Sequence, residues 1–471
     1  MKTEERDYAS YVRSKLAIHP PSGIADPTIG VRRLFPFQRD LVSWALRRGR
    51  AAVFADTGLG KTGMQIAWAD AVARHTSGDV LILAPLAVAA QTVAEGAACG
   101  VDVTLCRDAS DVRPGLNVTN YDRLHRFDPA RFSGVVLDES SCIKHHDAKT
   151  LRALLDAFAA CPFRFCATAT PAPNDWTELG THSEFLGVCT RTEMLSEFFC
   201  HDGGETQVWR LKGHARKAFW RWVSSWGAMV RRPSDLGYSD DGYTLPAART
   251  TSHTVATDAA TLRAGGVLFA QEAATLMDRR NARRGSVDAR VAMCADLVNA
   301  DPEPWIVWCD LNAESEALTK AIRGAVEVRG SDDPDTKEER LRAFSEGRVR
   351  VLVTKPSIAG FGLNWQHCAR VAFVGVTDSW EAYYQAVRRC WRFGQSREVQ
   401  VHIFASEAEG SVVANLARKE RDAAAMAESL SAETRDAVMA EVIGAVRTVN
   451  GYDARKAMRL PQWIKSEAEV V

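Results

Sequence analysis

Short apolar runs alternate with helical segments along most of the chain. In the first half, four runs have the length and composition of buried strands: Ala51–Ala55, Val80–Ala84, Val135–Leu137 and Phe163–Ala167. In the second half, a helix at Ala313–Arg323 lies among five further runs: Trp305–Cys309, Ala325–Val328, Val349–Thr354, Arg370–Val374 and Val399–Phe404. Strands that alternate with helices pair in parallel and are covered on both faces. The pattern therefore predicts an α/β protein with two parallel sheets.

The breaks in this alternation predict the domain boundaries. The first residues are polar and end in a Pro- and Gly-rich stretch, which suggests a helix followed by a loop. A segment rich in Trp, Arg and Gly separates the two α/β units, and we expect it to form a helical insertion. The expected order is a lead-in (1–33), a first α/β domain (34–189), the insertion (190–250), a helical linker (251–285), a second α/β domain (286–406) and a helical tail (407–471).

The composition is that of an ordinary globular chain and changes this picture little. Of 471 residues, 46% are hydrophobic and 25% are charged, and Lys plus Arg equals Asp plus Glu at 59 each. Net charge therefore gives no sign of a nucleic-acid partner, and any basic surface must be local. The sequence shows no signal peptide and no long apolar run, and its eleven cysteines form no C-x-x-C pair. We expect a monomeric, cytoplasmic protein with reduced thiols and no membrane contact.

The strongest chemical signal is Ala55–Thr62, a glycine-rich turn that follows a strand and opens a helix. Its two glycines let the backbone approach phosphate oxygens closely, and the amides at the start of the helix can hold them. The lysine can reach the β- and γ-phosphates, and the last threonine can bind Mg²⁺. We therefore expect an ATP and Mg²⁺ site formed by Thr57, Gly58, Gly60, Lys61 and Thr62.

Two carboxylates at the end of a strand complete the expected chemistry. Asp138 and Glu139 follow the apolar run Val135–Leu137, downstream of the phosphate loop. We expect Asp138 to bind Mg²⁺ directly or through water, and Glu139 to orient and deprotonate the attacking water. Taken alone, such an acidic pair is as often a solvated turn. Its place after a phosphate loop favours catalysis.

Three further side chains can serve the same site. Thr168 and Thr170 follow the fourth apolar run, where their hydroxyls can sense the γ-phosphate through Glu139. Gln38 precedes the first strand, and its amide can hydrogen-bond adenine while Phe37 packs nearby. Without a phosphate loop in the same chain, the two threonines would simply belong to a turn or a helix cap, and Gln38 would more often be a surface residue.

A second phosphate-binding group lies far downstream, in Gln385–Gln395. Arg389 and Arg392 are three residues apart, so on a helix their guanidinium groups point to the same side. Guanidinium matches phosphate oxygens in a rigid fork, and two on one face can clamp a triphosphate. A phosphate loop and a distant arginine pair together predict a two-domain ATP motor.

With these elements in this order, residues 34–406 resemble superfamily 2 helicases and translocases, in particular the Swi/Snf-type branch related to DEAD/DEAH-box helicases. The resemblance rests on eight motifs: Phe37-Gln38, Ala55–Thr62, Ala84-Pro85-Leu86, Thr119-Asn120-Tyr121, Asp138-Glu139, Thr168-Ala169-Thr170-Pro171, Gly360-Phe361-Gly362-Leu363-Asn364 and Gln385–Gln395. The last two are the most specific for this branch. The segment Leu137–Ser141 and the compact size are similar to phage- or prophage-encoded members, which implies a bacterial or phage-infected cell.

The resemblance implies two RecA-like P-loop domains with ATP between them, and it implies that Arg389 and Arg392 are arginine fingers from the second domain. It implies coupling of nucleotide to DNA by the residues Gly360, Gly362, Asn364 and Gln385, of which Gly362 also lies near ATP. It implies nucleic-acid contacts for Pro85, Thr119, Asn120 and Tyr121.

The chain also departs from this branch. Ser140 and Ser141 stand where the named box families have Ala-Asp or Ala-His, and Ala169 stands where glycine is frequent. Hydrolysis should survive because Asp138 and Glu139 remain. Chromatin-reading modules are missing from the sequence, so nucleosome remodelling is not expected.

The insertion mixes basic and aromatic residues, which suits a groove for nucleic acid. We expect its residues Arg216, Lys217 and Arg221 to contact the backbone. Most of its aromatic residues recur at helical spacing and are better explained by packing. Nearby cysteines and histidines match no zinc-site spacing and are expected to be unrelated to one another: Cys189, Cys200, His201 and His214.

Three functions remain open from the sequence. The first is an ATP-dependent translocase on DNA, with double-stranded DNA as a sequence-independent track. The second is a strand-separating helicase acting on DNA or RNA. The third belongs to another class, a catalytically silent DNA-binding scaffold with a motor fold. The intact Lys61, Asp138 and Glu139 argue against the third.

Overall fold

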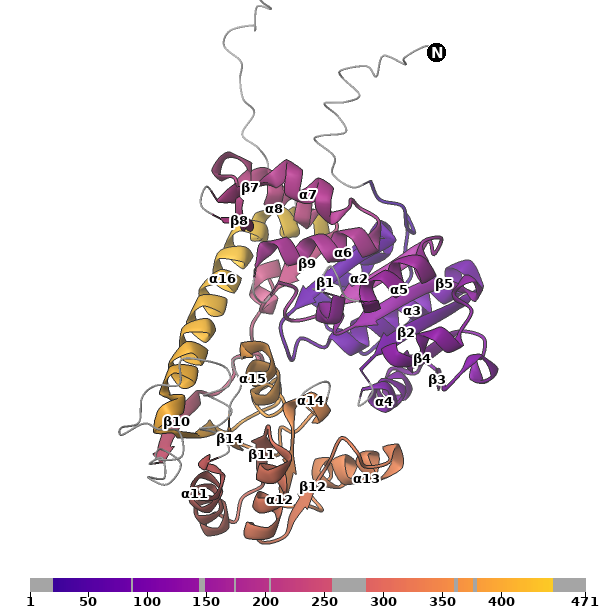
Figure 1. Cartoon of the computed structure of the whole chain (residues 1–471). Coiled ribbons are helices and arrows are strands. Elements are labelled where there is room, and N and C mark those ends of the chain that lie inside the picture. Colours follow the sequence, from indigo (N-terminus) through magenta and orange to yellow (C-terminus); the bar gives the residue numbers. More distant parts are fainter. Residues whose placement is uncertain are drawn as a thin grey trace, which may run out of the picture.

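The computed structural model describes residues 20–85, 88–143, 149–172, 175–202, 205–255, 285–359, 363–375 and 379–443. They form two α/β domains, each built on one parallel sheet, as the strand pattern predicted. Figure 1 shows the two domains one above the other, with the long helix α16 along one side. This is the architecture of two RecA-like domains. Within the described residues, no helix has both the length and the apolar character needed to cross a bilayer.

The first domain has a seven-stranded parallel sheet in the order β3-β4-β2-β5-β6-β1-β9. Its strands are β1 (Arg50–Ala55), β2 (Asp79–Ala84), β3 (Val103–Leu105), β4 (Leu116–Asn120), β5 (Phe132–Asp138), β6 (Phe163–Ala167) and β9 (Gly227–Val230). Its main helices are α2 (Pro36–Arg48), α3 (Lys61–Thr76), α4 (Ala89–Cys99), α5 (Lys149–Phe158) and α6 (Leu179–Leu186). The central strands are buried on both faces between two apolar clusters. The P-loop therefore starts from a rigid strand.

Three of the seven strands were not predicted from the sequence, and for two of them, β3 and β4, the reason lies in the strand itself. β3 is only three residues long. β4 carries two asparagines, which are rare in strands. Asn117 is nevertheless fully buried, because its amide nitrogen donates to the carbonyls of Arg113 and Gly115 at 2.8 and 3.2 Å. Local hydrogen bonds thus let a polar sequence lie inside the sheet.

Much of the segment expected as an insertion completes the first domain. β9 pairs in parallel with β1 and places Val230 beside Ala55. Trp226, just before β9, is fully buried against Phe54 and Trp222. The part that forms a sheet of its own is the antiparallel hairpin of β7 (Phe199–Asp202) and β8 (Glu205–Leu211), flanked by α7 (Arg191–Phe198) and α8 (Arg216–Ser224). β9 is only four residues long and follows a segment rich in tryptophan and arginine, so its sequence signal is too weak to predict that this segment joins the sheet.

The second domain has a six-stranded parallel sheet in the order β10-β15-β14-β11-β13-β12. Its strands are β10 (Ala248–Val255), β11 (Trp305–Cys309), β12 (Ala325–Glu327), β13 (Val351–Thr354), β14 (Arg370–Val374) and β15 (Val399–Ser406). Its helices are α11 (Val287–Ala300), α12 (Asn312–Ala321), α13 (Pro334–Ser345), α14 (Pro356–Ala359) and α15 (Trp380–Val387). Figure 1 shows α14 and α15 on the side that faces the first domain.

The expected helical linker begins instead with strand β10. This strand pairs with β15 over eight residues, from Ala248 opposite Val399 to Val255 opposite Ser406. Its sequence is rich in threonine, a β-branched residue that favours strands. Residues 256–284, which make up nearly all of the rest of the expected linker, lie outside the described part of the chain.

The C-terminal helix α16 (Gly410–Ile443) leaves the second domain and ends on the first. Val438 and Val442 are buried in the core beside α2. Arg435 donates to the carbonyl of Ser234 at 2.9 Å, and Glu441 forms an ion pair with Arg48. The tail therefore joins the two domains a second time, in addition to the chain connection through β10.

Replacing Trp226 by Ala should lower the free energy of unfolding of the first domain by about 3–5 kcal/mol, because it removes a fully buried indole. Urea denaturation followed by circular dichroism measures the change. Arg221→Ala, at an exposed site on the preceding helix, is the control and should shift the value by no more than about 0.5 kcal/mol. Equal stability of Trp226→Ala and wild type would contradict the placement of this segment in the core.

Candidate active site

The turn between β1 and α3 has the form of a phosphate-binding loop. Gly58 and Gly60 have φ angles of 94° and 76°, which other residues rarely adopt. The Lys61 ammonium donates to the carbonyl of Ala55 at 2.9 Å. The Thr57 hydroxyl is buried and has no hydrogen-bond partner among the described residues. A phosphate here would satisfy the hydroxyl, pair with the lysine and meet the amides at the start of α3, so the residues fit the expected ATP.

Gln38 packs against the phosphate loop and hydrogen-bonds to its backbone. Its amide nitrogen donates to the carbonyl of Leu59 at 2.8 Å, and its amide oxygen accepts from the backbone N–H of Phe35 at 2.9 Å. A Cβ atom at Gly60 would lie only 2.3 Å from Gln38 Nε2, so the loop and the amide are closely fitted. Both ends of the amide are engaged by protein, and its contact with adenine stays a prediction.

Aromatic rings from both domains gather beside the same loop. The ring of Phe393 lies 4.7 Å from that of Tyr243 and 6.3 Å from that of Phe35. A Cβ atom at Gly58 would come within 2.9 Å of the Phe393 nitrogen. Phe37, which the sequence suggested as the ring near adenine, is buried in the core, whereas Phe35 is 47% exposed. A partly exposed ring next to a phosphate loop is the better candidate to contact a purine.

The acidic pair closes the end of β5. Gln65 of α3 donates to Asp138 Oδ1 at 2.5 Å, and the Tyr121 hydroxyl donates to the Asp138 carbonyl at 2.7 Å. Glu139 has a φ angle of 50°, an unfavourable value for a residue with a side chain. The Thr168 hydroxyl lies 3.5 Å from Glu139 Oε2. Gln65 thus orients the Asp138 carboxylate, and Thr168 is near enough to respond to Glu139.

The charges around this pair are held in a buried setting. Burial and the neighbouring Glu139 raise the pKa of Asp138 to about 6, although Gln65 and Lys61 act in the opposite direction. Burial also lowers the pKa of Lys61, against the pull of the nearby carboxylates. A divalent cation would offset the cost of these carboxylate charges. Asp138 and the Thr62 hydroxyl are oxygen ligands of the kind that Mg²⁺ takes, so the donor set fits the ion.

An ion pair between the P-loop and the second domain was not predicted. Arg388 donates Nη2 to Asp56 Oδ2 at 3.0 Å, and the Tyr384 hydroxyl donates to Asp56 Oδ1 at 2.6 Å. The guanidinium lies over the rings of Tyr384 and Trp391, 5.1 and 4.5 Å from their centres. Burial alone would raise the pKa of Asp56, but Arg388 and Tyr384 lower it below its usual value. A residue of the P-loop therefore holds the second domain.

Arg389 and Arg392 converge, but by a different geometry from the one expected. Helix α15 ends at Val387, so the two arginines share the turn beyond it rather than a helical face. Each donates Nη1 to the carbonyl of Leu363, at 3.3 and 3.2 Å. Both therefore gather at one point beside the expected Gly360–Asn364 motif.

The two arginines differ in how far they are engaged. Arg389 is 2% exposed and also donates to the backbone carbonyl and side-chain oxygen of Gln385, both at 2.9 Å. Arg392 is half-buried, and its Nε has no hydrogen-bond partner among the described residues. Burial and the neighbouring Arg389 lower the pKa of Arg392 to about 9. A phosphate would relieve this repulsion, so Arg392 is the better placed of the two to meet one.

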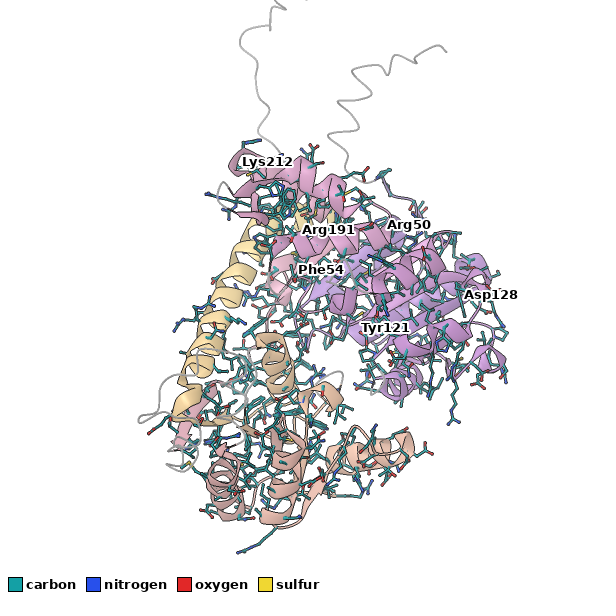
Figure 2. The ribbon with its side chains drawn as sticks, in the orientation of Figure 1. Arg50, Phe54, Tyr121, Asp128, Arg191 and Lys212 are labelled. Carbon is teal, nitrogen blue, oxygen red and sulfur yellow. The ribbon has the colours of Figure 1, made fainter. Side chains whose placement is uncertain are left out.

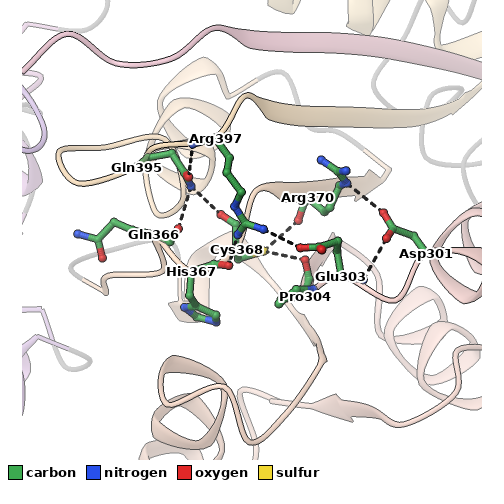
Figure 3. Close-up of polar contacts among 9 residues, drawn as sticks. All are labelled: Asp301, Glu303, Pro304, Gln366, His367, Cys368, Arg370, Gln395 and Arg397. Atoms are coloured by element: carbon green, nitrogen blue, oxygen red, sulfur yellow. Dashed lines mark hydrogen bonds and ion pairs between the residues drawn. The ribbon is translucent and has the colours of Figure 1, made fainter.

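Gln395, the last residue of the segment Gln385–Gln395, has a structural role. Gln395 Nε2 donates to the carbonyls of Gln366 and Cys368 at 2.9 and 3.1 Å, as Figure 3 shows. Its oxygen accepts from the backbone N–H of Arg397 at 3.0 Å. The amide therefore ties the arginine turn to the loop before β14 and limits the movement of Arg389 and Arg392.

The remaining coupling residues lie in different settings. The Thr170 hydroxyl lies 3.4 Å from Glu381 of α15, which makes it another contact between the domains. Asn364 is exposed, and Gln385 is fully buried. Gly360 and Gly362 fall outside the described residues. Their roles stay predictions.

The residues expected to touch nucleic acid also differ in exposure. Thr119 and Asn120 are buried, and Asn120 accepts from the backbone N–H of Arg123 at 3.1 Å. Tyr121 is held by the Asp138 carbonyl described above, and Pro85 is half-buried. The basic residues of the insertion are exposed on α8: Arg216, Lys217 and Arg221. Of the set, α8 offers its side chains most openly.

Residues 289–394 match the family model of the helicase conserved C-terminal domain. The matched region runs from α11 to the turn that carries Arg388, Arg389 and Arg392, so it contains every second-domain contact with the P-loop described above. No curated protein matches the sequence. The match supports a helicase- or translocase-type nucleic-acid motor of superfamily 1 or 2.

Removing the ion pair between the domains should open them. In the absence of nucleotide, Arg388→Gln should give a larger radius of gyration than wild type in small-angle X-ray scattering, because Asp56 loses its charged partner. Arg397→Gln is the control, since it removes an exposed ion pair with Glu303 within the second domain. An unchanged radius for Arg388→Gln would show that the pair does not hold the domains together.

Asp138→Asn should stabilise the nucleotide-free protein more at high pH than at low pH. The raised pKa means that the folded wild type keeps a proton that the unfolded chain has lost, so its stability falls as the pH rises through about 4 to 6. Between about pH 5 and pH 8 the variant should gain about 1 kcal/mol relative to wild type. Urea unfolding at both pH values measures this, and a difference independent of pH would contradict it.

Proposed function

We propose that the protein is a nucleic-acid-dependent ATPase of the Swi/Snf-like branch of superfamily 2, which couples ATP hydrolysis to movement along DNA. The observation that carries the proposal is the contact of the P-loop with the second domain, through Asp56 with Arg388 and Gly58 with Phe393. ATP at this loop would lie where the domains meet. Its binding and loss would therefore change the contact between them.

In this proposal the first domain binds ATP through the P-loop. Lys61, the Thr57 hydroxyl and the amides at the start of α3 hold the phosphates, and Phe35 contacts the base. Mg²⁺, bound by Thr62 and Asp138, would neutralise charge on the β- and γ-phosphates. Glu139 orients the attacking water and accepts its proton. Thr168, at 3.5 Å, would transmit the state of Glu139 to its neighbours.

The second domain completes the site with arginines. Arg392 stabilises the charge that develops on the γ-phosphate. Arg389 holds Arg392 in position, because both donate to the carbonyl of Leu363. Whether Arg388 stays paired with Asp56 depends on the charge in the loop, because a bound triphosphate competes with Asp56 for the guanidinium of Arg388. Hydrolysis thereby alters the closure of the domains, and each cycle can advance the protein along a strand.

The proposed track is duplex DNA, gripped through its phosphates without regard to sequence. Such a grip weakens as salt rises, because bound phosphates release counterions. A strand-separating DNA or RNA helicase is the alternative, and displacement of a labelled strand distinguishes the two. A bacterial or phage-infected cell, a cytoplasmic location and a monomeric state belong to the same proposal.

One experiment tests the proposal most directly. The ATPase rate is measured without nucleic acid and with single-stranded DNA, duplex DNA or RNA, each at two salt concentrations. We expect the largest stimulation with duplex DNA and a loss of stimulation at high salt. Lys61→Ala and Arg392→Ala should each reduce kcat by about 10³-fold or more. Equal rates with and without nucleic acid, or full activity of Lys61→Ala, would refute the proposal.

A further inference from the structure

The first domain has a cavity at the end away from the second domain. We propose that this cavity, between the hairpin β7–β8 and helix α8, binds an unpaired nucleotide of a nucleic-acid strand. The inference rests on the proposed nucleic-acid partner, but it is independent of the ATP site. Figure 2 shows Lys212, which lies on the rim of the cavity, at the end of the first domain that is farther from the second domain.

The cavity has the size and lining of a ligand site. Its volume is about 720 Å³, within the range of pockets for small molecules. Three of its lining side chains are indoles and three are cations: Trp176, Trp209, Trp220, Arg210, Lys212 and Arg216. In the described part of the chain, no acidic side chain lines it.

The indoles offer surfaces on which a base can stack. Trp176 and Trp220 meet edge to face with their rings 5.0 Å apart, which fixes the orientation of both. Trp209 lies 3.9 Å from the ring of His201 on the facing strand. Trp176 and Trp209 are only half-buried, so part of each ring remains open to the cavity. A base that is paired within a duplex has both faces covered by its neighbours, whereas an unpaired base can stack on these rings.

The cations suit the phosphates on either side of such a base. Arg210 and Arg216 are exposed at the cavity. The ammonium of Lys212 donates to the carbonyls of Ser196 and Glu197 at 2.8 and 2.9 Å, which holds its charge at the rim. Aromatic faces beside several cations match the two parts of a nucleotide, its base and its phosphate.

The cavity is also connected to the P-loop by a short path. α8 forms one wall and ends at Ser224, and β9 begins at Gly227 and pairs with β1. The carbonyl of Val230, at the end of β9, accepts from the backbone N–H of Asp56 at 2.9 Å. A nucleotide on α8 would therefore contact a helix that leads, within a few residues, into the strand that adjoins the loop. This arrangement lets the protein hold an unpaired strand end while the motor works on the neighbouring duplex.

The test uses a single-stranded DNA oligonucleotide that carries 2-aminopurine, a base whose fluorescence falls when it stacks. Wild type should quench it. Trp209→Leu and Arg210→Gln should each weaken binding by about tenfold, and Trp209→Leu should also remove the quenching. Arg107→Gln, an exposed charge change at the other edge of the first domain, should match wild type. Because Arg210 is exposed, its replacement tests the cavity even if Trp209→Leu disturbs the hairpin.

Two comparisons make the result decisive. An oligonucleotide with an abasic position should bind wild type less tightly than the intact strand, but it should bind Trp209→Leu equally well. A free nucleoside monophosphate should compete only weakly, because it lacks the second phosphate. Equal binding of the intact strand by wild type and Arg210→Gln, or competition by the free nucleotide as strong as by the strand, would overturn the inference.

The outcome is separable from the proposed motor function. If the ATPase of wild type is stimulated by duplex DNA while the cavity variants bind the oligonucleotide normally, the cavity proposal fails and the motor proposal stands. If the variants lose the oligonucleotide while no nucleic acid stimulates the ATPase, the cavity is supported and the motor proposal fails.

Discussion

The ion pair between Asp56 and Arg388 is the contact on which the arrangement of the two domains depends. It joins the phosphate loop of one sheet to the turn after α15 of the other, in a setting that is largely buried. The stacking of the guanidinium on Tyr384 and Trp391 holds it in one geometry. Losing one partner of such a pair would leave the other charge buried without compensation, so the pair favours contact between the phosphate loop and the second domain.

The same region concentrates charge that the fold alone does not neutralise. Asp138 has a raised pKa, Lys61 and Arg392 have lowered ones, and burial is the first cause in each case. The triphosphate and the divalent cation of the proposed function would supply the opposite charges that these buried groups lack. The positive φ angle of Glu139 belongs to the same pattern, in which local strain lies next to the expected chemistry.

Two elements remote from this chemistry keep it in place. β9 adds a seventh strand beside β1 and bonds to the N–H of Asp56, so the segment after the hairpin stabilises the loop directly. Helix α16 runs from the second domain to the core beside α2, and it limits how far the domains can separate. Contacts between residues far apart in sequence thus surround the proposed nucleotide site.

The sequence by itself determined the two α/β units, the phosphate loop and the acidic pair. Each of these features depends on a local pattern, an apolar run followed by glycines or carboxylates. Such a pattern predicts the same strand and turn in any fold that buries the apolar run. Only the tertiary structure decided the rest. Arg388 could not be told from its arginine neighbours until α15 ended at Val387 and turned it toward Asp56. β9 and β10 could not be recognised because a short or polar strand owes its conformation to the strand beside it, here β1 and β15. Those partners lie more than a hundred residues away, and only packing brings them together.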